Sequence, residues 1–437
     1  MEAHQSGLNA FIAVTADQAR TQAREAEAEI SKNGPRSALH GIALAHKDIV
    51  NVANTATTCG SEVLAQNVAR ANGAVIDRLD SAGAISLGKL NMNEFATILP
   101  SDYFGPTVNP WNAEHTPGGS SSGSGVAVAS GLCAGALGTD TGGSIRLPST
   151  YCGITGLKAT HGRISNRGVF PLAWSLDHIG PMTRSARDAA LIYEAIAGYD
   201  PEDLASRDVT PSAQLNIDED SGLKGVHIAF PAAFLPQMTD PDVSRAMEEA
   251  LAVFRDLGAK VTALDIPALN DAWPIAERII CAEASTVHAP YLDSVPELYG
   301  AKIRKFLERA RAISAQDYVK ARRDKARFKR TVLSALSAYD ALVLPGALTP
   351  PPPLGARTLS LHGNDQDVLT ASVAATCPFN LTGQPALSVP SGLSAAGLPV
   401  GIQIVGKLWD EAMVLRLGQA FQGCTTWHST RPEVVHS

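Results

Sequence analysis

Two clusters of glycine and serine are the part of this chain best suited to chemistry. They cover Gly118–Gly125 and Gly142–Ser144. The first leads into a stretch of small residues, 125–131, predicted as a helix, and then into an apolar stretch, 134–138, predicted as a strand. Glycine beside serine lets the backbone turn sharply and leaves N–H groups free to bind a developing oxyanion. The pattern therefore indicates a serine nucleophile placed in a glycine-rich loop.

A phosphate-binding loop is a weaker interpretation of these glycines. The chain contains no G-x-x-x-x-G-K-[ST] string, and G-x-G-x-x-G also fails to match. The closest approach, Gly83–Lys89, is followed by Leu90 and so lacks the hydroxyl that would bind a metal ion.

A second interpretation is the nucleophile elbow of an α/β-hydrolase-type esterase. Residues Gly119–Gly123 match G-x-S-x-G, with Ser121 as nucleophile. That fold needs an acid and then a histidine further along the chain. His288, His362 and His428 are available, but none lies in a recognisable context. So short a pattern also arises easily by chance in a sequence rich in glycine and serine.

A third interpretation accounts for both clusters together. Ser120 in PGGSSSGSG and Ser144 in DTGGSIRLPS are 24 residues apart, and matching segments occur before and after them in a fixed order. This arrangement resembles the amidase signature family, densely over residues 39–200 and more loosely over 370–421. The other segments that carry the resemblance are GIALAHKD (41–48), GKLNMNEFA (88–96), SLDHIGP (175–181), Asn380, Gly383, Pro385 and GLPVGIQ (397–403).

The resemblance implies a catalytic triad of Lys47, Ser120 and Ser144. Ser144 would be the nucleophile, Ser120 a proton bridge held by a cis peptide bond, and Lys47 the base. A lysine can act as a base only if burial lowers its pKa, and the apolar residues around Lys47 favour burial. The resemblance also gives the oxyanion hole and a serine that supports Ser120: the N–H groups of Thr141, Gly142, Gly143 and Ser144, and the hydroxyl of Ser121.

Residues next to these motifs are assigned structural roles first. Asp140 and Arg146 are predicted to form an ion pair that fixes the nucleophile loop, in preference to binding substrate. Cys152 is interpreted as a buried packing residue. Trp174 is either a lining of the acyl pocket or an ordinary tryptophan. His46 precedes the lysine where the family has an apolar residue, which leaves its effect on the pKa of Lys47 open.

The surrounding elements alternate between helices and short apolar strands, which favours an α/β fold with a mixed sheet. The resemblance implies the amidase signature fold, a large twisted mixed β-sheet flanked by helices on both faces. We expect one domain over 1–437, with its core in 39–200 and 341–421 and a helical excursion in 265–340. Helices are predicted at 16–30, 67–82, 189–196, 240–257 and 410–421, and strands at 84–87, 226–230, 260–264, 341–344, 386–389 and 400–405.

Composition and charge narrow the class of protein. The 437 residues are 45% hydrophobic and 18% charged with a net charge of −7, which disfavours a nucleic-acid partner. The six cysteines contain no C-x-x-C pair, so reduced, buried thiols in a cytoplasmic protein are expected. The first residues lack the apolar core of a signal peptide, and no membrane partner is expected. No metal or organic cofactor is implied.

Together these observations predict a serine hydrolase that cleaves linear amides through an acyl-enzyme, with carbamates, ureas and esters as chemically related substrates. A first alternative is the glutaminase-type subunit of a tRNA-dependent amidotransferase. The acidic chain and the segment 168–175 favour a stand-alone amidase over it. The α/β-hydrolase with Ser121 is a second alternative. A catalytically dead binding protein is disfavoured because all three triad positions are filled, and a homodimer is left open.

Overall fold

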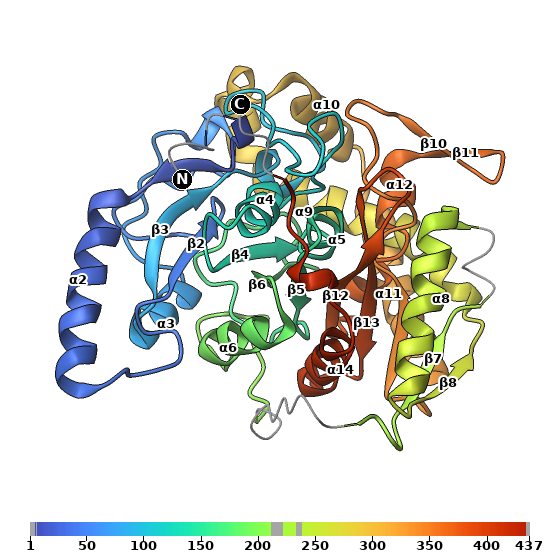
Figure 1. Ribbon diagram of the computed structural model, residues 1–437. Coiled ribbons are helices and arrows are strands. Elements are labelled where there is room, and N and C mark those ends of the chain that lie inside the picture. The colour runs from blue at the N-terminus through green and yellow to red at the C-terminus, as the bar shows by residue number, and fades with distance from the viewer. Residues whose placement is uncertain (1–4, 6, 211–221, 233–237, 434–437) are drawn as a thin grey trace.

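A mixed β-sheet of eleven strands forms the centre of the molecule in the computed structural model (Figure 1). The structure describes residues 5, 7–210, 222–232 and 238–433. Strand order is β1-β3-β2-β4-β6-β5-β12-β13-β9-β7-β8. Strand β2 is parallel to β3 and β4, and β7 is parallel to β8 and β9, whereas all other neighbours in this sheet are antiparallel. This is the mixed sheet with the amidase signature fold that the sequence predicts.

The strands are short, as the sequence indicates. They are β1 (Phe11–Val14), β2 (Ala43–Lys47), β3 (Ile85–Leu90), β4 (Gly135–Asp140), β5 (Thr155–Lys158), β6 (His178–Thr183), β7 (His227–Phe230), β8 (Lys260–Ala263), β9 (Ala341–Pro345), β12 (Ala386–Leu393) and β13 (Pro399–Gly406), with β10 (Thr358–Leu361) and β11 (Asn364–Asp367) in a separate hairpin.

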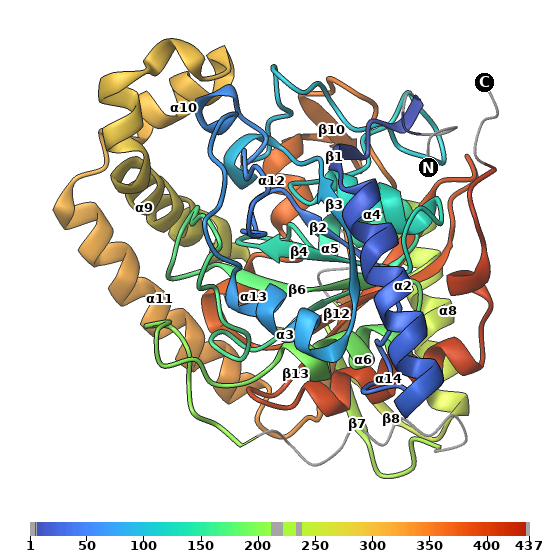
Figure 2. The ribbon, with the colours of Figure 1, turned by 90° about the vertical axis from the view of Figure 1, so that its left-hand side faces the viewer.

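Helices cover both faces of the sheet. Figure 2 shows α4 and α5 on one side of β4, β6 and β12, and α6 and α14 on the other. The helices are α2 (Ala16–Asn33), α3 (Ala74–Ala82), α4 (Ser122–Ala129), α5 (Arg146–Cys152), α6 (Ala186–Ile196), α8 (Pro241–Asp256), α9 (Ala272–Ser294), α10 (Ala301–Ala310), α11 (Ala315–Ala335), α12 (Val368–Val373), α13 (Pro378–Thr382) and α14 (Glu411–Gly423).

Local sequence explains where several helices begin. The side chain of Ser185 accepts a hydrogen bond from the N–H of Asp188 at the start of α6, and Asp240 does the same for Asp242 before α8. At α11, Ser314 and Asp317 form a reciprocal capping box. Each cap satisfies backbone donors that have no partner inside the helix.

The helical excursion predicted over 265–340 is present as α9, α10 and α11. Figure 2 shows these helices together at one edge of the molecule, outside the sheet. Helix α11 packs against α9 and against α13. The excursion is therefore attached to the body of the protein beside the residues that follow the nucleophile loop in space.

The sheet positions the glycine–serine loops because β2 and β4 are parallel neighbours. Their register pairs His46 with Leu137, so both strands end at the same edge of the sheet. Lys47 is the last residue of β2, and Asp140 is the last residue of β4. The loop 141–144 follows directly, as the fold requires for residues that are to meet Lys47.

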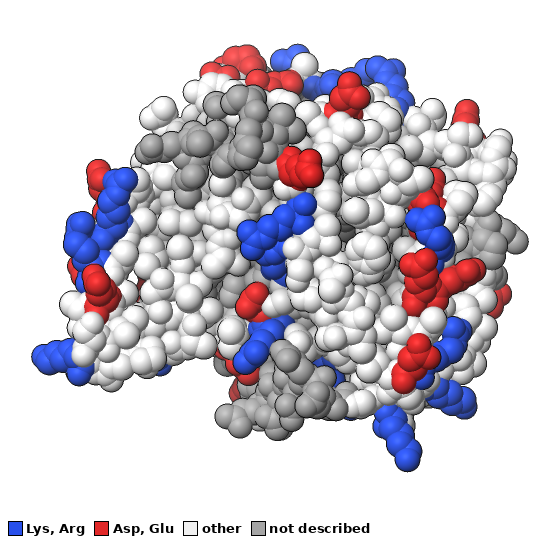
Figure 3. All heavy atoms as spheres, viewed as in Figure 1, with Lys and Arg blue, Asp and Glu red and all other residues white. Residues whose placement is uncertain are grey.

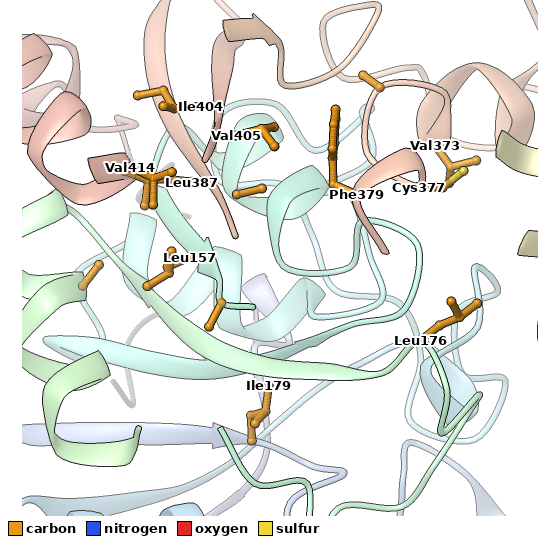
Figure 4. Packing of buried hydrophobic residues seen from close by; sticks show 14 of the residues in the cluster. Leu157, Leu176, Ile179, Val373, Cys377, Phe379, Leu387, Ile404, Val405 and Val414 are labelled. Carbon is orange, nitrogen blue, oxygen red and sulfur yellow. The ribbon is translucent and has the colours of Figure 1, made fainter. Parts of the chain in front are cut away.

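Packing against the sheet is continuous and apolar. Figure 4 shows Leu387 of β12 and Val414 of α14 among the buried side chains of the main cluster, with Ile179 of β6 further along the sheet. All three side chains are at most 1% exposed. Burial of this extent stabilises the fold by about 25 cal/mol for each Å² of apolar surface removed from water.

Some predicted elements are corrected by the structure. The helix predicted over 67–82 begins only at Ala74, because residues 67–72 form bends and a bridge between Val68 and Ala56. Strands β1, β2, β5, β6, β10 and β11 were not predicted. The proline run 349–353 is non-helical, as expected.

The cysteines are unpaired, but they are not all buried. Cys424 is exposed and Cys281 is partly exposed, which corrects the expectation that every thiol is buried. Among the described residues, no helix is long and apolar enough to cross a membrane.

Candidate active site

Lys47 lies at the centre of the candidate site and is completely buried. Its Nζ donates one hydrogen bond of 2.8 Å to Oγ of Ser120 and another of 2.8 Å to Oγ1 of Thr139. The parallel pairing of β2 and β4 brings Lys47 and Thr139 together, since both stand at the same edge of the sheet. The lysine is therefore held between two hydroxyl groups.

Burial lowers the pKa of Lys47 to about 7, although the negative charges of Asp140 and Asp177 act in the opposite direction. A substantial share of Lys47 is then neutral near pH 7 and able to accept a proton. Burial, together with the charge of Lys89, lowers the pKa of His46 to about 3. His46 is thus neutral at pH 7 and adds no positive charge beside Lys47.

Ser120 and Ser121 are fully buried and precede α4. The peptide bond between Gly119 and Ser120 is cis, as the family resemblance implies. The hydroxyl of Ser121 donates to the carbonyl of Thr139 at 3.1 Å and accepts from the N–H of Thr139 at 3.2 Å. Both hydrogen-bonding directions of Ser121 are therefore used by the backbone of β4.

The loop from Thr141 to Ser144 lies beside these serines. The N–H of Ser121 donates to the carbonyl of Ser144 at 3.2 Å. Ser144 is partly exposed, and its hydroxyl makes no hydrogen bond to any residue that the structure describes. Within the same part of the chain, none of the N–H groups of residues 141–144 is used in a hydrogen bond. A reachable hydroxyl thus stands next to unused backbone donors.

Gly143 shows why this loop needs glycine. Its φ of +141° is one that residues with a side chain rarely adopt, and a Cβ at this position would overlap the side chain of Thr376. Oγ1 of Thr376 donates to the carbonyl of Gly142 at 2.6 Å. The loop is therefore packed directly against the segment before α13.

Asp140 and Arg146 form the predicted ion pair, with Nη2 of Arg146 2.8 Å from Oδ1 of Asp140. Both side chains are completely buried. Burial alone would raise the pKa of Asp140, but the adjacent guanidinium and hydrogen bonds lower it to about 2. Arg146 also donates to the side chains of Asn380 and Gln403. This network ties the start of α5 to α13 and β13.

Asp177 supports the loop from the other side. Its carboxylate accepts a 2.6 Å hydrogen bond from Oγ1 of Thr141 and further bonds from the N–H groups of Leu172 and Ala173. Burial raises the pKa of Asp177 to about 6, although these hydrogen bonds lower it in part. The segment 172–177 is thereby connected to the first residue of the nucleophile loop.

Two residues of this arrangement were missed by sequence reasoning, namely Thr139 and Thr376. Neither belongs to a glycine–serine cluster, so only the pairing of strands and the packing before α13 bring them here. Cys152 is completely buried, and burial raises the pKa of its thiol, as expected of a packing residue. Trp174 is 44% exposed, so it is a surface tryptophan at the edge of the segment 172–177.

Charge and metal chemistry add little else. Within the described part of the chain, no group of three His, Cys, Asp or Glu residues could hold a metal ion. On the face drawn in Figure 3, side chains of both signs are interspersed rather than gathered into one basic patch.

Comparison with known proteins places this geometry in a family. The Amidase family model matches residues 1–415. A glutamyl-tRNA(Gln) amidotransferase subunit from Geotalea daltonii is 38% identical, covering 99% of this chain and 93% of the relative. Among solved structures, peptide amidase from Stenotrophomonas maltophilia (29% identical, TM-score 0.84) and the corresponding amidotransferase subunit from Thermotoga maritima (31%, 0.83) each cover 98% of this chain and align over 91% of their own length.

The fold and these matches define an enzyme that acts on carbon–nitrogen bonds. The chain belongs to the amidase signature family of hydrolases.

Proposed function

We propose that this protein hydrolyses the C–N bond of an amide through an acyl-enzyme on Ser144, with Ser120 as proton bridge and Lys47 as base. The observation that carries the proposal is the 2.8 Å hydrogen bond between the buried Nζ of Lys47 and Oγ of Ser120. The lowered pKa of this lysine, about 7, makes it a usable base near neutral pH.

The steps follow from these positions. Neutral Lys47 takes the proton of Ser120, which takes that of Ser144, and Oγ of Ser144 attacks the carbonyl carbon. The N–H groups of residues 141–144 stabilise the resulting oxyanion, each donor contributing on the order of 10²–10³ in rate. Collapse expels the amine or ammonia, which receives the proton back through Ser120. Water then attacks the acyl-enzyme by the same route and restores Ser144.

The amide itself has two candidates. Sequence reasoning favoured a stand-alone amidase, and the peptide amidase of S. maltophilia is a structural neighbour of that kind. The curated relatives at 37–39% identity are instead named as a subunit of glutamyl-tRNA(Gln) amidotransferase, which favours the glutaminase-type alternative. Glutamine is therefore the first substrate to test, in the presence and absence of the other subunits of such a complex.

The α/β-hydrolase alternative has less support. It requires the hydroxyl of Ser121 as nucleophile, whereas that hydroxyl is buried and bonded in both directions to the backbone of Thr139.

The test is release of ammonia or amine from a panel of glutamine, aliphatic amides, peptide amides, carbamates and ureas. Turnover by the chain alone supports a stand-alone amidase. Turnover of glutamine only after partner subunits are added supports the glutaminase-type alternative. The proposal fails if every substrate is inert under both conditions and a fluorophosphonate does not label Ser144.

A further inference from the structure

Helix α11 carries an unusual concentration of positive charge. Its segment 316–330 has seven Lys or Arg side chains and two acidic ones. Sequence reasoning assigned this segment to a solvated helix face in preference to a partner-binding face. Two of the lysines depart from that expectation, since Lys325 and Lys329 are only partly exposed. Because they are four residues apart, they lie on the same face of the helix.

These two lysines point toward the body of the enzyme. Nζ of Lys325 donates a 2.7 Å hydrogen bond to the carbonyl of Ser175. A Cβ built on Gly383 would lie 3.9 Å from Nζ of Lys329 and 3.2 Å from Cβ of His161. The ammonium group of Lys329 and the side chain of His161 thus approach each other over Gly383, the residue that follows α13.

Further nitrogen-bearing side chains continue the cluster inward. The rings of His161 and His178 have centroids 5.1 Å apart, and Nε2 of His178 is 3.3 Å from Nζ of Lys158. Nε2 of His161 is buried and has no hydrogen-bond partner among the described residues. Burial lowers the pKa of Lys325 to about 8 and also lowers the pKa of Lys329, as expected for cations that lack a compensating anion.

Nearby carboxylates do not neutralise this cluster. In the part of the chain that the structure describes, no carboxylate lies within ion-pair distance of Lys158, Lys325 or Lys329, because the acidic groups in the same region are bound to arginines instead. These pairs are Glu283 with Arg322, Glu411 with Arg163, and Asp140 with Arg146. Positive charge that is partly withdrawn from water and unpaired favours an anionic ligand.

The cluster adjoins the candidate active site. Lys325 holds the carbonyl of Ser175, and two residues later Asp177 accepts the hydrogen bond from Thr141 at the start of the nucleophile loop. His178 contacts the carbonyl of Asp140 through Nδ1 at 3.2 Å. Only the segment 174–178 separates the lysines from the loop, so one small molecule can reach both.

We propose that Lys325 and Lys329, with His161 beside them, bind a carboxylate of the substrate, so that the preferred substrate is an amide carrying a carboxylate a few bonds from the scissile carbonyl. The inference rests on the proposed function and specifies its substrate class. Glutamine and the monoamides of dicarboxylic acids both belong to this class. Uncharged aliphatic amides lack the group that the lysines would hold.

The test compares two amides of equal length, glutaramate and pentanamide, which differ in a terminal carboxylate against a methyl group. We expect kcat/KM to favour glutaramate by about 10- to 100-fold, the range for a hydrogen bond to a charged group. Lys325→Met and Lys329→Met should each reduce this preference about tenfold or more, and Lys329→Arg should restore part of it. Lys320→Met is the matched control, because its side chain on the same helix is 74% exposed, and it should leave the preference unchanged.

Binding gives a readout that does not require turnover. We expect malonate, succinate or glutarate to bind in calorimetry, with an affinity at least tenfold lower in Lys329→Met. Equal use of glutaramate and pentanamide, or dicarboxylate binding that Lys325→Met and Lys329→Met leave intact, would overturn the inference while the proposed hydrolysis stands. Failure of every dicarboxylate to bind would also overturn it. Failure of the proposed function is distinct, since it is seen as the absence of turnover and of labelling at Ser144.

Discussion

Lys47 and Thr139 stand at the same edge of two adjacent parallel strands, and Nζ of the lysine donates a 2.8 Å hydrogen bond to Oγ1 of the threonine. The second hydrogen bond of Lys47 goes to Ser120. A lysine buried among hydroxyl groups is deprived of water without gaining a carboxylate, and this explains why its pKa falls to about 7.

The first prediction concerns the pH dependence of the reaction. Below pH 7 Lys47 binds a proton and can no longer act as a base, so kcat/KM should fall tenfold for each pH unit on the acidic side. Above this value the rate should level off. A plateau that extends below about pH 5 would contradict a lysine base with this pKa.

A second prediction concerns stability and has the opposite experimental requirement, because no substrate is needed. Between pH 7 and 10.5 the unfolded chain binds a proton on Lys47 that the folded chain lacks. The free energy of unfolding should therefore rise with pH across this window. In Lys47→Met, denaturant unfolding at pH 7.5 and 9.5 should show a smaller rise than the wild type. An equal rise in both proteins would indicate that Lys47 titrates normally.

A third prediction separates two neighbouring glycines. Gly143→Ala places a Cβ against Thr376 at a φ of +141°, so the loop must shift and kcat should fall on the order of 10²-fold, about the loss of one oxyanion donor. Gly142→Ala is the control, since its Cβ would be 4.0 Å from Cys377 and would meet no overlap. Equal kinetics of the two variants would mean that the loop tolerates displacement.

A fourth prediction addresses the buried ion pair. Arg146→Met leaves Asp140 buried without its guanidinium, which should lower the free energy of unfolding by about 3–5 kcal/mol. Arg20→Met removes an exposed pair with Asp17 and should cost about 0–1 kcal/mol. Denaturant titration of both variants measures the difference, and similar small losses in the two would show that the Arg146 network does not stabilise the fold.

Sequence reasoning anticipated the groups of the site better than their environment. Lys47, Ser120 and Ser144 were proposed from motifs, because motif residues lie in short recognisable segments. Thr139 escaped notice, since its contact with Lys47 depends on the register of β2 against β4. Thr376 reaches Gly142 across 234 residues of chain, a contact that local patterns do not encode.

The fold shows the same division between local and long-range information. Amphipathic helices such as α8 were predicted to within about two residues, because six buried apolar side chains repeat along one face. Strand β5, with the sequence TGLK, was missed, since four residues with one glycine carry too little apolar pattern. The helix assigned to 67–82 was too long because Gly73, its actual N-cap, was counted as interior.

The most direct test of the central claim is the identity of the serine that becomes acylated. The protein is treated with a fluorophosphonate, digested, and analysed by mass spectrometry, with Ser144→Ala and Ser121→Ala treated alongside. We predict an adduct on Ser144 in the wild type, none in Ser144→Ala, and retained labelling in Ser121→Ala. An adduct on Ser121, or full hydrolytic activity of Ser144→Ala, would contradict the account.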